Sequence, residues 1–69
     1  MTQKELSYVE DAIGHECNII KIIDEGIKNL EDEELVAFMN GELDTHKEMK
    51  EKLMNLLEGK ANEWSVNYG

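Results

Sequence analysis

The feature that most constrains this chain is a regular spacing of apolar residues through its first half. They stand three or four positions apart, with one step of seven between Ile13 and Ile20, in the order Leu6, Val9, Ile13, Ile20, Ile23, Ile27 and Leu30. A helix turns once in about 3.6 residues, so this spacing gathers them into one stripe. The segment Thr2-Gln3-Lys4-Glu5 has the Ser/Thr-x-x-Glu form of a capping box. We therefore predict a helix from about Gln3 to Leu30.

A second helix is indicated after a short turn. Asn29 can end the first helix in the left-handed conformation, and Asp32 can cap the next one. The second apolar stripe consists of Leu35, Phe38 or Met39, Leu43, Met49, Leu53 and Leu56 or Leu57. Gly59 followed by Lys60 is a typical helix stop. A turn of about two to four residues makes the helices antiparallel neighbours, which predicts an all-α fold, an antiparallel two-helix hairpin.

A chain of 69 residues allows one domain. We assign residues 1–60 to the helical hairpin and residues 61–69 to a C-terminal tail, because no clear period continues beyond Lys60. Within that tail, Trp64 either docks back onto the helices or frays from them.

The charge balance excludes several classes of function. Acidic residues number 16 and basic residues 7, giving a net charge of −9, so we expect binding neither to nucleic acid nor to anionic membranes. The apolar runs are too short for a membrane span or a signal peptide. The single cysteine cannot form an internal disulfide. A cytoplasmic, reducing location is the prediction.

The apolar stripes are wider than one neighbouring helix can cover. Ile19 and Ile22 widen the first stripe, while Val36 and Phe38 widen the second. We therefore expect a homodimer of hairpins that forms a four-helix bundle. The alternative is a monomer in which the C-terminal tail covers the gap.

Three polar residues interrupt the stripes. Glu16 stands in the first stripe, and Glu42 and His46 stand near the centre of the second. With the turn centred near Asp32, Glu16 and His46 face each other, and Glu42 lies one turn of about 6 Å from His46. A buried carboxylate without a partner is costly, so the three groups are expected to meet.

Two interpretations of this polar group stay open. Carboxylates and imidazole suit Fe, Mn or Zn, and metal sites of helical bundles take their ligands from facing helices. Glu16, Glu42 and His46 are thus candidate metal ligands. Alternatively, a hydrogen-bonded Glu16–His46 pair sets the register and the symmetry of the dimer without any ion.

The order of these residues resembles a ferritin-like half-bundle, as in rubrerythrin-type and spore-coat-F-like small proteins. The likeness extends over about residues 6–57 and includes the segment Asp32-Glu33-Glu34-Leu35-Val36-Ala37-Phe38-Met39. It implies metal ligation by a glutamate of the first helix and by a Glu-x-x-His pair of the second. Glu16 and His46 match those positions. The pair departs from the pattern, because Leu43 stands three residues before His46 and Glu42 stands four before it.

We favour a structural, assembly or metal-binding role over enzymatic activity for this small acidic protein. Neither a glycine-rich phosphate loop nor a nucleophile–base arrangement is indicated. The alternative is an interaction module whose acidic face binds a basic protein. In one version, Asn40-Gly41-Glu42-Leu43-Asp44 resembles the Ser-x-Glu-Leu-Asp motif of small sporulation aspartyl-phosphate phosphatases, which act on a response regulator; Asn40 replaces the serine.

Overall fold

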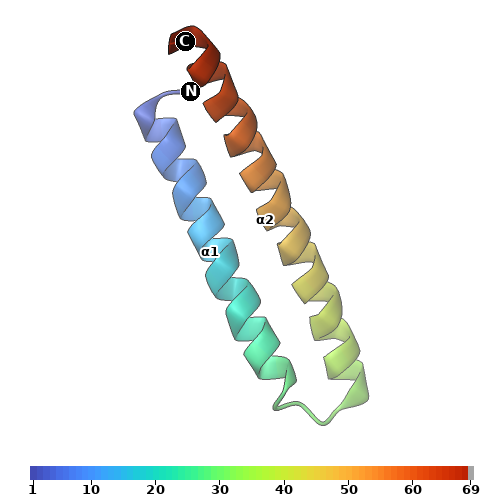
Figure 1. Cartoon of the computed structure of the whole chain (residues 1–69). Coiled ribbons are helices and arrows are strands. Elements are labelled where there is room, and N and C mark those ends of the chain that lie inside the picture. Colours follow the sequence, from blue (N-terminus) through green and yellow to red (C-terminus); the bar gives the residue numbers. More distant parts are fainter. Residues whose placement is uncertain (69) are drawn as a thin grey trace.

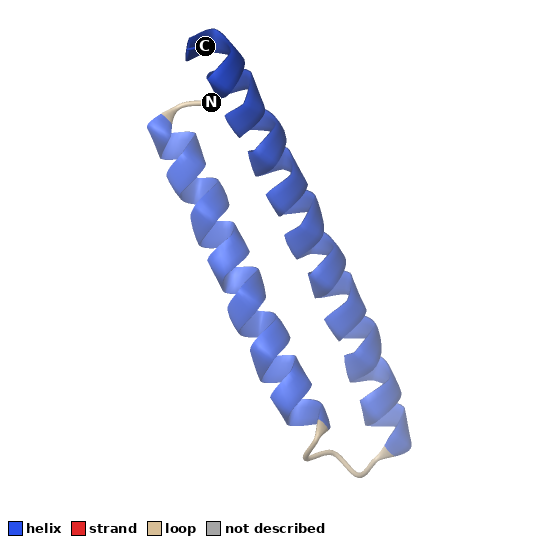
Figure 2. Cartoon of the chain, viewed as in Figure 1, coloured by secondary structure: helices blue, strands red, loops and turns tan. Residues whose placement is uncertain are grey.

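The computed structural model is a hairpin of two long helices (Figures 1 and 2). It describes the backbone of residues 1–68 and the side chains of residues 1–60. Helix α1 spans Gln3–Ile27 and helix α2 spans Glu33–Tyr68, and the two lie side by side in opposite directions. No strand occurs within the described backbone, which confirms the predicted all-α hairpin. Among the described residues, neither helix is long and apolar enough to cross a membrane.

The start of α1 is fixed by the predicted capping box. The Thr2 N–H donates to Glu5 Oε1 over 2.8 Å, and the Glu5 N–H donates to Thr2 Oγ1 over 3.1 Å. These two bonds satisfy backbone donors that the first turn of a helix leaves without partners. The hydrogen bond from the Thr2 backbone, more than any other contact, lowers the pKa of the Glu5 carboxyl below its ordinary 4.5.

Helix α1 ends at Ile27, earlier than the predicted Leu30. The left-handed conformation expected at Asn29 is also wrong, because no described non-glycine residue has a positive φ. The Asn29 side-chain amide instead donates to the Glu25 carbonyl over 3.1 Å, and its backbone N–H donates to the Gly26 carbonyl over 3.0 Å. These bonds satisfy the last carbonyls of the helix without a left-handed residue.

The start of α2 is fixed by Asp32, as predicted. Its Oδ1 accepts hydrogen bonds from the N–H groups of Glu34 and Leu35 at 2.9 and 3.1 Å. Glu33 and Glu34 occupy the first turn, where the helix dipole favours negative charge. The connection comprises residues 28–32 and is slightly longer than the expected turn.

Helix α2 does not stop at Gly59. It continues to Tyr68, so the helix stop predicted at Gly59 and Lys60 is wrong. A glycine ends a helix by adopting a positive φ, and no described glycine does so. Residues 61–68 therefore extend α2. The side chain of Trp64, for which docking and fraying were both expected, lies outside the described side chains.

The helices meet along one row of side chains each, which we call the inner rows. Every member is at least partly buried. The inner row of α1 is Leu6, Val9, Ile13, Glu16, Ile20, Ile23 and Ile27, continued by Leu30 in the connection, and that of α2 is Val36, Met39, Leu43, His46, Lys50, Leu53, Leu57 and Lys60. Both rows keep the alternating spacing of three and four residues that is typical of left-handed helix packing.

The predicted stripe of α2 is therefore partly wrong. Leu43 is 7% exposed and belongs to the inner row, but Leu35, Phe38, Met49 and Leu56 are 44–63% exposed. Leu35, Met49 and Leu56 each stand one residue before an inner-row position, which turns them to the edge of the contact with α1. The wide stripe of α2 consists of two adjacent rows, of which α1 covers one.

Candidate polar site between the helices

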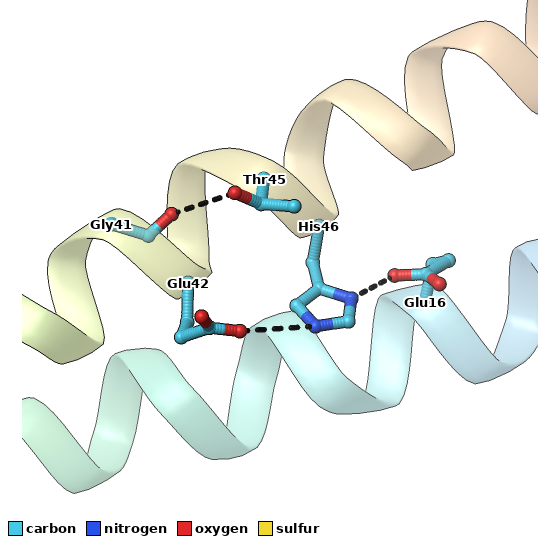
Figure 3. Close-up of polar contacts among 5 residues, drawn as sticks. All are labelled: Glu16, Gly41, Glu42, Thr45 and His46. Atoms are coloured by element: carbon cyan, nitrogen blue, oxygen red, sulfur yellow. Dashed lines mark hydrogen bonds and ion pairs between the residues drawn. The ribbon is translucent and has the colours of Figure 1, made fainter.

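The centre of the hairpin holds one close polar contact between the two helices. His46 Nδ1 lies 2.6 Å from Glu16 Oε2 (Figure 3). Glu16 is only 8% exposed and is the buried charged residue of the described side chains. Both residues occupy the inner rows, where Glu16 stands between Ile13 and Ile20 and His46 stands between Leu43 and Lys50. The sequence prediction that Glu16 and His46 face each other is confirmed.

The short distance follows from the chemistry of the two groups. An ionised carboxylate only accepts hydrogen bonds, so the His46 tautomer that fits an ionised Glu16 carries its proton on Nδ1 and donates it to Glu16 Oε2. Bonds between a charged acceptor and an N–H are shorter and stronger than neutral ones, most of all when water is excluded. The side chains of His46 and Glu16 are 22% and 10% exposed. This contact lets two polar residues occupy an apolar seam.

Glu42 lies at the edge of the same site. The His46 ring stands between the two carboxylates, with one nitrogen facing each of them (Figure 3). Glu42 Oε2 is 3.9 Å from His46 Nε2, which is beyond hydrogen-bonding distance but within the range of an ion pair when the ring is protonated. The Glu42 side chain is 43% exposed. Its predicted place near the centre of the stripe is wrong, because it precedes the inner-row residue Leu43 by one position.

The neighbouring polar groups do not enter the site. Thr45 Oγ1 donates to the Gly41 carbonyl over 3.0 Å within α2 (Figure 3). His15 and Cys17, which flank Glu16 in the chain, are both exposed. No buried side-chain nitrogen or oxygen of the described residues lacks a hydrogen-bond partner. The polar site is thus complete with Glu16 and His46, and Glu42 adds a second carboxylate at its rim.

The predicted metal ligands do not form a metal site of three or more ligands within the described residues of one chain. Among the described residues, no group of three or more His, Cys, Asp or Glu is arranged to hold an ion. His46 Nδ1 is already bonded to Glu16 Oε2, which leaves His46 Nε2 and the Glu42 carboxylate facing each other.

The phosphatase-like segment lies on α2. Asn40 and Asp44 are exposed, while Leu43 is buried against α1. The resemblance to the phosphatase motif requires an exposed aspartate, and Asp44 is exposed. Among the described residues, no hydrogen bond or ion pair joins Asp44 to a histidine.

Comparisons with known proteins do not assign the chain. No family model matches its sequence, and neither a curated protein nor a solved structure matches it. The resemblance to ferritin-like half-bundles therefore stays a prediction that depends on Glu16, His46 and the hairpin order.

Proposed function

We propose that this chain is a structural building block, one half of a four-helix bundle that works as a homodimer. The observation that carries the proposal is the amount of apolar surface the hairpin leaves uncovered. Tyr8, Ile22 and Phe38 are 66%, 69% and 63% exposed. Soluble monomers seldom expose large apolar side chains in groups, whereas interaction surfaces do.

The thin core of the hairpin supports the same proposal. Among the described side chains, only Ile23 and Leu43 form a buried apolar core, and none of the described residues is fully buried. A compact domain of about 60 residues buries only about 60% of the surface that its unfolded chain exposes, less than larger domains do, and a single pair of helices buries less still. Two further helices would cover the exposed apolar side chains and give the hairpin a core.

The Glu16–His46 contact has a defined role in this proposal. Apolar side chains pack against one another in several registers, because their contacts are not directional. A buried hydrogen-bonded pair is satisfied in one register only, since any shift along the helix leaves both groups unpaired. Glu16 and His46 therefore align α1 with α2, and the apolar rows supply the attraction.

Metal binding is the second candidate role, and one observation favours it. A carboxylate bonded to one ring nitrogen of a histidine is the usual support for a histidine that binds metal through the other. Glu16 stands in that relation to His46, with Nε2 turned toward Glu42. In a dimer, a second set of Glu42 and His46 would supply the donors missing from one chain. Fe, Mn or Zn suits this donor set.

Thermal unfolding tests the assembly proposal. If folding and association are coupled, the midpoint temperature rises with protein concentration, because a second copy binds only the folded chain. An unfolding midpoint that stays constant while the protein concentration changes over roughly a hundredfold range would contradict the assembly proposal. Metal content measured after supply of Fe, Mn and Zn tests the second role. Protein that retains none of the three contradicts it, as does equal retention by His46→Gln.

A further inference from the structure

Each helix carries a second row of side chains beside its inner row. The outer row of α1 is Tyr8, Ala12, His15, Ile19 and Ile22, and that of α2 is Leu35, Phe38, Glu42, Thr45, Met49, Lys52 and Leu56. Both outer rows repeat the alternating spacing of three and four residues. A helix with two such rows has two helical neighbours, and the hairpin supplies one of them.

The two outer rows lie on the same side of the hairpin. In both helices the row includes residues that stand one position before an inner-row residue, such as Ile19 before Ile20 and Met49 before Lys50. Seen from one end of the hairpin, successive residues of α1 turn in one direction around its axis. Successive residues of α2 turn in the opposite direction, because α2 runs the other way. Residues that precede the seam therefore project to one common side in an antiparallel pair. We call this side the outer face.

The opposite side of the hairpin has a different character. There a groove of about 1000 Å³ lies between the helices, with Ile13, Ile20 and Leu57 among its lining residues. Charged side chains also line it, including Glu10, Lys47, Glu51 and Glu58. Glu10 and Lys47 each follow an inner-row residue, whereas the residues of the outer rows precede one. Helical geometry therefore places the groove residues and the outer rows on opposite sides of the hairpin.

We propose that the outer face is the dimerisation surface and that its occupant is the outer face of a second copy. This inference rests on the proposed assembly role and names the surface that carries it. Tyr8, Ile22, Leu35, Phe38, Met49 and Leu56, all 44–69% exposed, form its apolar part. In the stacked dimer they lie between the two hairpins.

Charge distribution supports a second copy as the occupant. One third of the chain is charged, with a net charge of −9, yet the outer rows contain only Glu42 and Lys52 as fixed charges. Interface centres are depleted of charged residues in this manner. A basic partner would instead meet one of the acidic faces. Stacking two outer faces leaves Glu42 as the acidic residue of the outer rows within the interface and keeps the acidic residues of the other faces in solvent, where water and salt reduce their repulsion.

The dimensions agree with a stable dimer. The outer row of α2 extends over roughly 30 Å, and two helices are about 20 Å wide. The outer face therefore offers on the order of 600 Å² before side-chain relief is counted, which approaches the ~800 Å² per partner of standard interfaces. The second copy also provides rows of matching spacing, as packing of four helices requires.

Two charge-introducing variants separate the outer face from the groove. Phe38→Glu places a carboxylate in the outer face, and Met54→Glu places one in the groove wall, at a residue of similar kind that is 48% exposed. Sedimentation equilibrium is the readout. Phe38→Glu should weaken the dimer on the order of a hundredfold or more, because burying an unpaired charge in an interface is costly. Met54→Glu should leave it unchanged.

Thiol labelling keeps the test informative if Phe38→Glu fails to fold. In a Cys17→Ser background, Ile22→Cys reports on the outer face and Asp24→Cys on the opposite edge of the same helix turn. Ile22 and the Asp24 side chain are 69% and 58% exposed in the single hairpin. Raising the protein concentration should slow labelling at position 22 and not at position 24.

The outcomes distinguish this inference from the assembly proposal. The outer face is not the dimerisation surface if the dimer survives Phe38→Glu and dissociates with Met54→Glu. The same conclusion follows if dimerisation slows labelling at position 24 and not at position 22. Either result leaves the assembly proposal intact. An unmodified chain that sediments at 7.9 kDa at every concentration overturns both.

Discussion

His46 Nδ1 lies 2.6 Å from Glu16 Oε2, across an otherwise apolar seam between α1 and α2. The two residues are 30 positions apart in the chain, so the contact depends on the hairpin and on one alignment of its helices. Glu16 is buried, and its polar partner in the hairpin is His46.

Glu16→Ala should destabilise the protein by about 1–3 kcal/mol, because the imidazole then remains in the seam without its acceptor. Urea denaturation followed by circular dichroism measures the change. Glu48→Ala, at an exposed position of α2, is the control and should cost under about 0.5 kcal/mol. Equal losses for both variants would show that the pair does not contribute.

Glu16→Leu combined with His46→Leu should recover most of the stability that either single change loses. Replacing both members of a buried polar pair with apolar residues is often neutral or stabilising, whereas removing one leaves the other unpaired. The two single variants and the double variant form a cycle whose coupling should be on the order of 1 kcal/mol or more. Additive losses would contradict direct coupling between the two side chains.

The double variant also tests alignment. If the pair selects the register, the apolar version should be stable but should populate more than one alignment of α1 and α2. Nuclear magnetic resonance would then show additional or broadened amide signals for the inner rows. One sharp set of signals would indicate that the apolar rows select the register without the pair.

Asp32→Ala should cost about 1 kcal/mol, because α2 loses the cap that binds two backbone N–H groups. Glu31→Ala is the matched control, since this neighbouring exposed acid makes no such bond among those found in the structure. Thermal denaturation of the two variants under identical protein concentration is the comparison. A larger effect at position 31 would contradict the assigned cap.

Glu5 should confer a small pH dependence on the first turn of α1. Its pKa is lowered in the folded chain, chiefly by the hydrogen bond from the Thr2 backbone, so its carboxylate stabilises the helix above the unfolded pKa. This contribution should be lost as the pH falls through the lower, folded pKa. Carbon-detected titration of the Glu5 carboxyl measures the shift, and Thr2→Pro, which lacks the backbone N–H donor, should move the pKa back toward 4.5. An unchanged titration in Thr2→Pro would contradict the cause.

The first helix and the polar pair were predictable from the sequence because their signals are local or periodic. The capping box at Thr2 and Glu5 is a four-residue code, and Glu16 is a single interruption in an otherwise apolar row. His46 likewise interrupts the apolar stripe of the second helix, and its pairing with Glu16 follows from the position of the turn.

The remaining differences have physical causes. Leu35 and Val36 are both apolar, and the sequence alone does not show which of two adjacent rows faces α1; the structure shows that Val36 does. That ambiguity placed Glu42 in the seam, one position from its true place at the rim. Gly59 would end α2 only by adopting a positive φ. Glycine can adopt this conformation but does not have to, and Gly59 does not.

Sedimentation equilibrium of the unmodified protein, over concentrations from well below to well above the micromolar range, tests the central claim most directly. The account predicts a particle of twice the 7.9 kDa chain mass at high concentration, dissociating on dilution with loss of helical signal. A stable, helical particle of one chain mass at every concentration would contradict it.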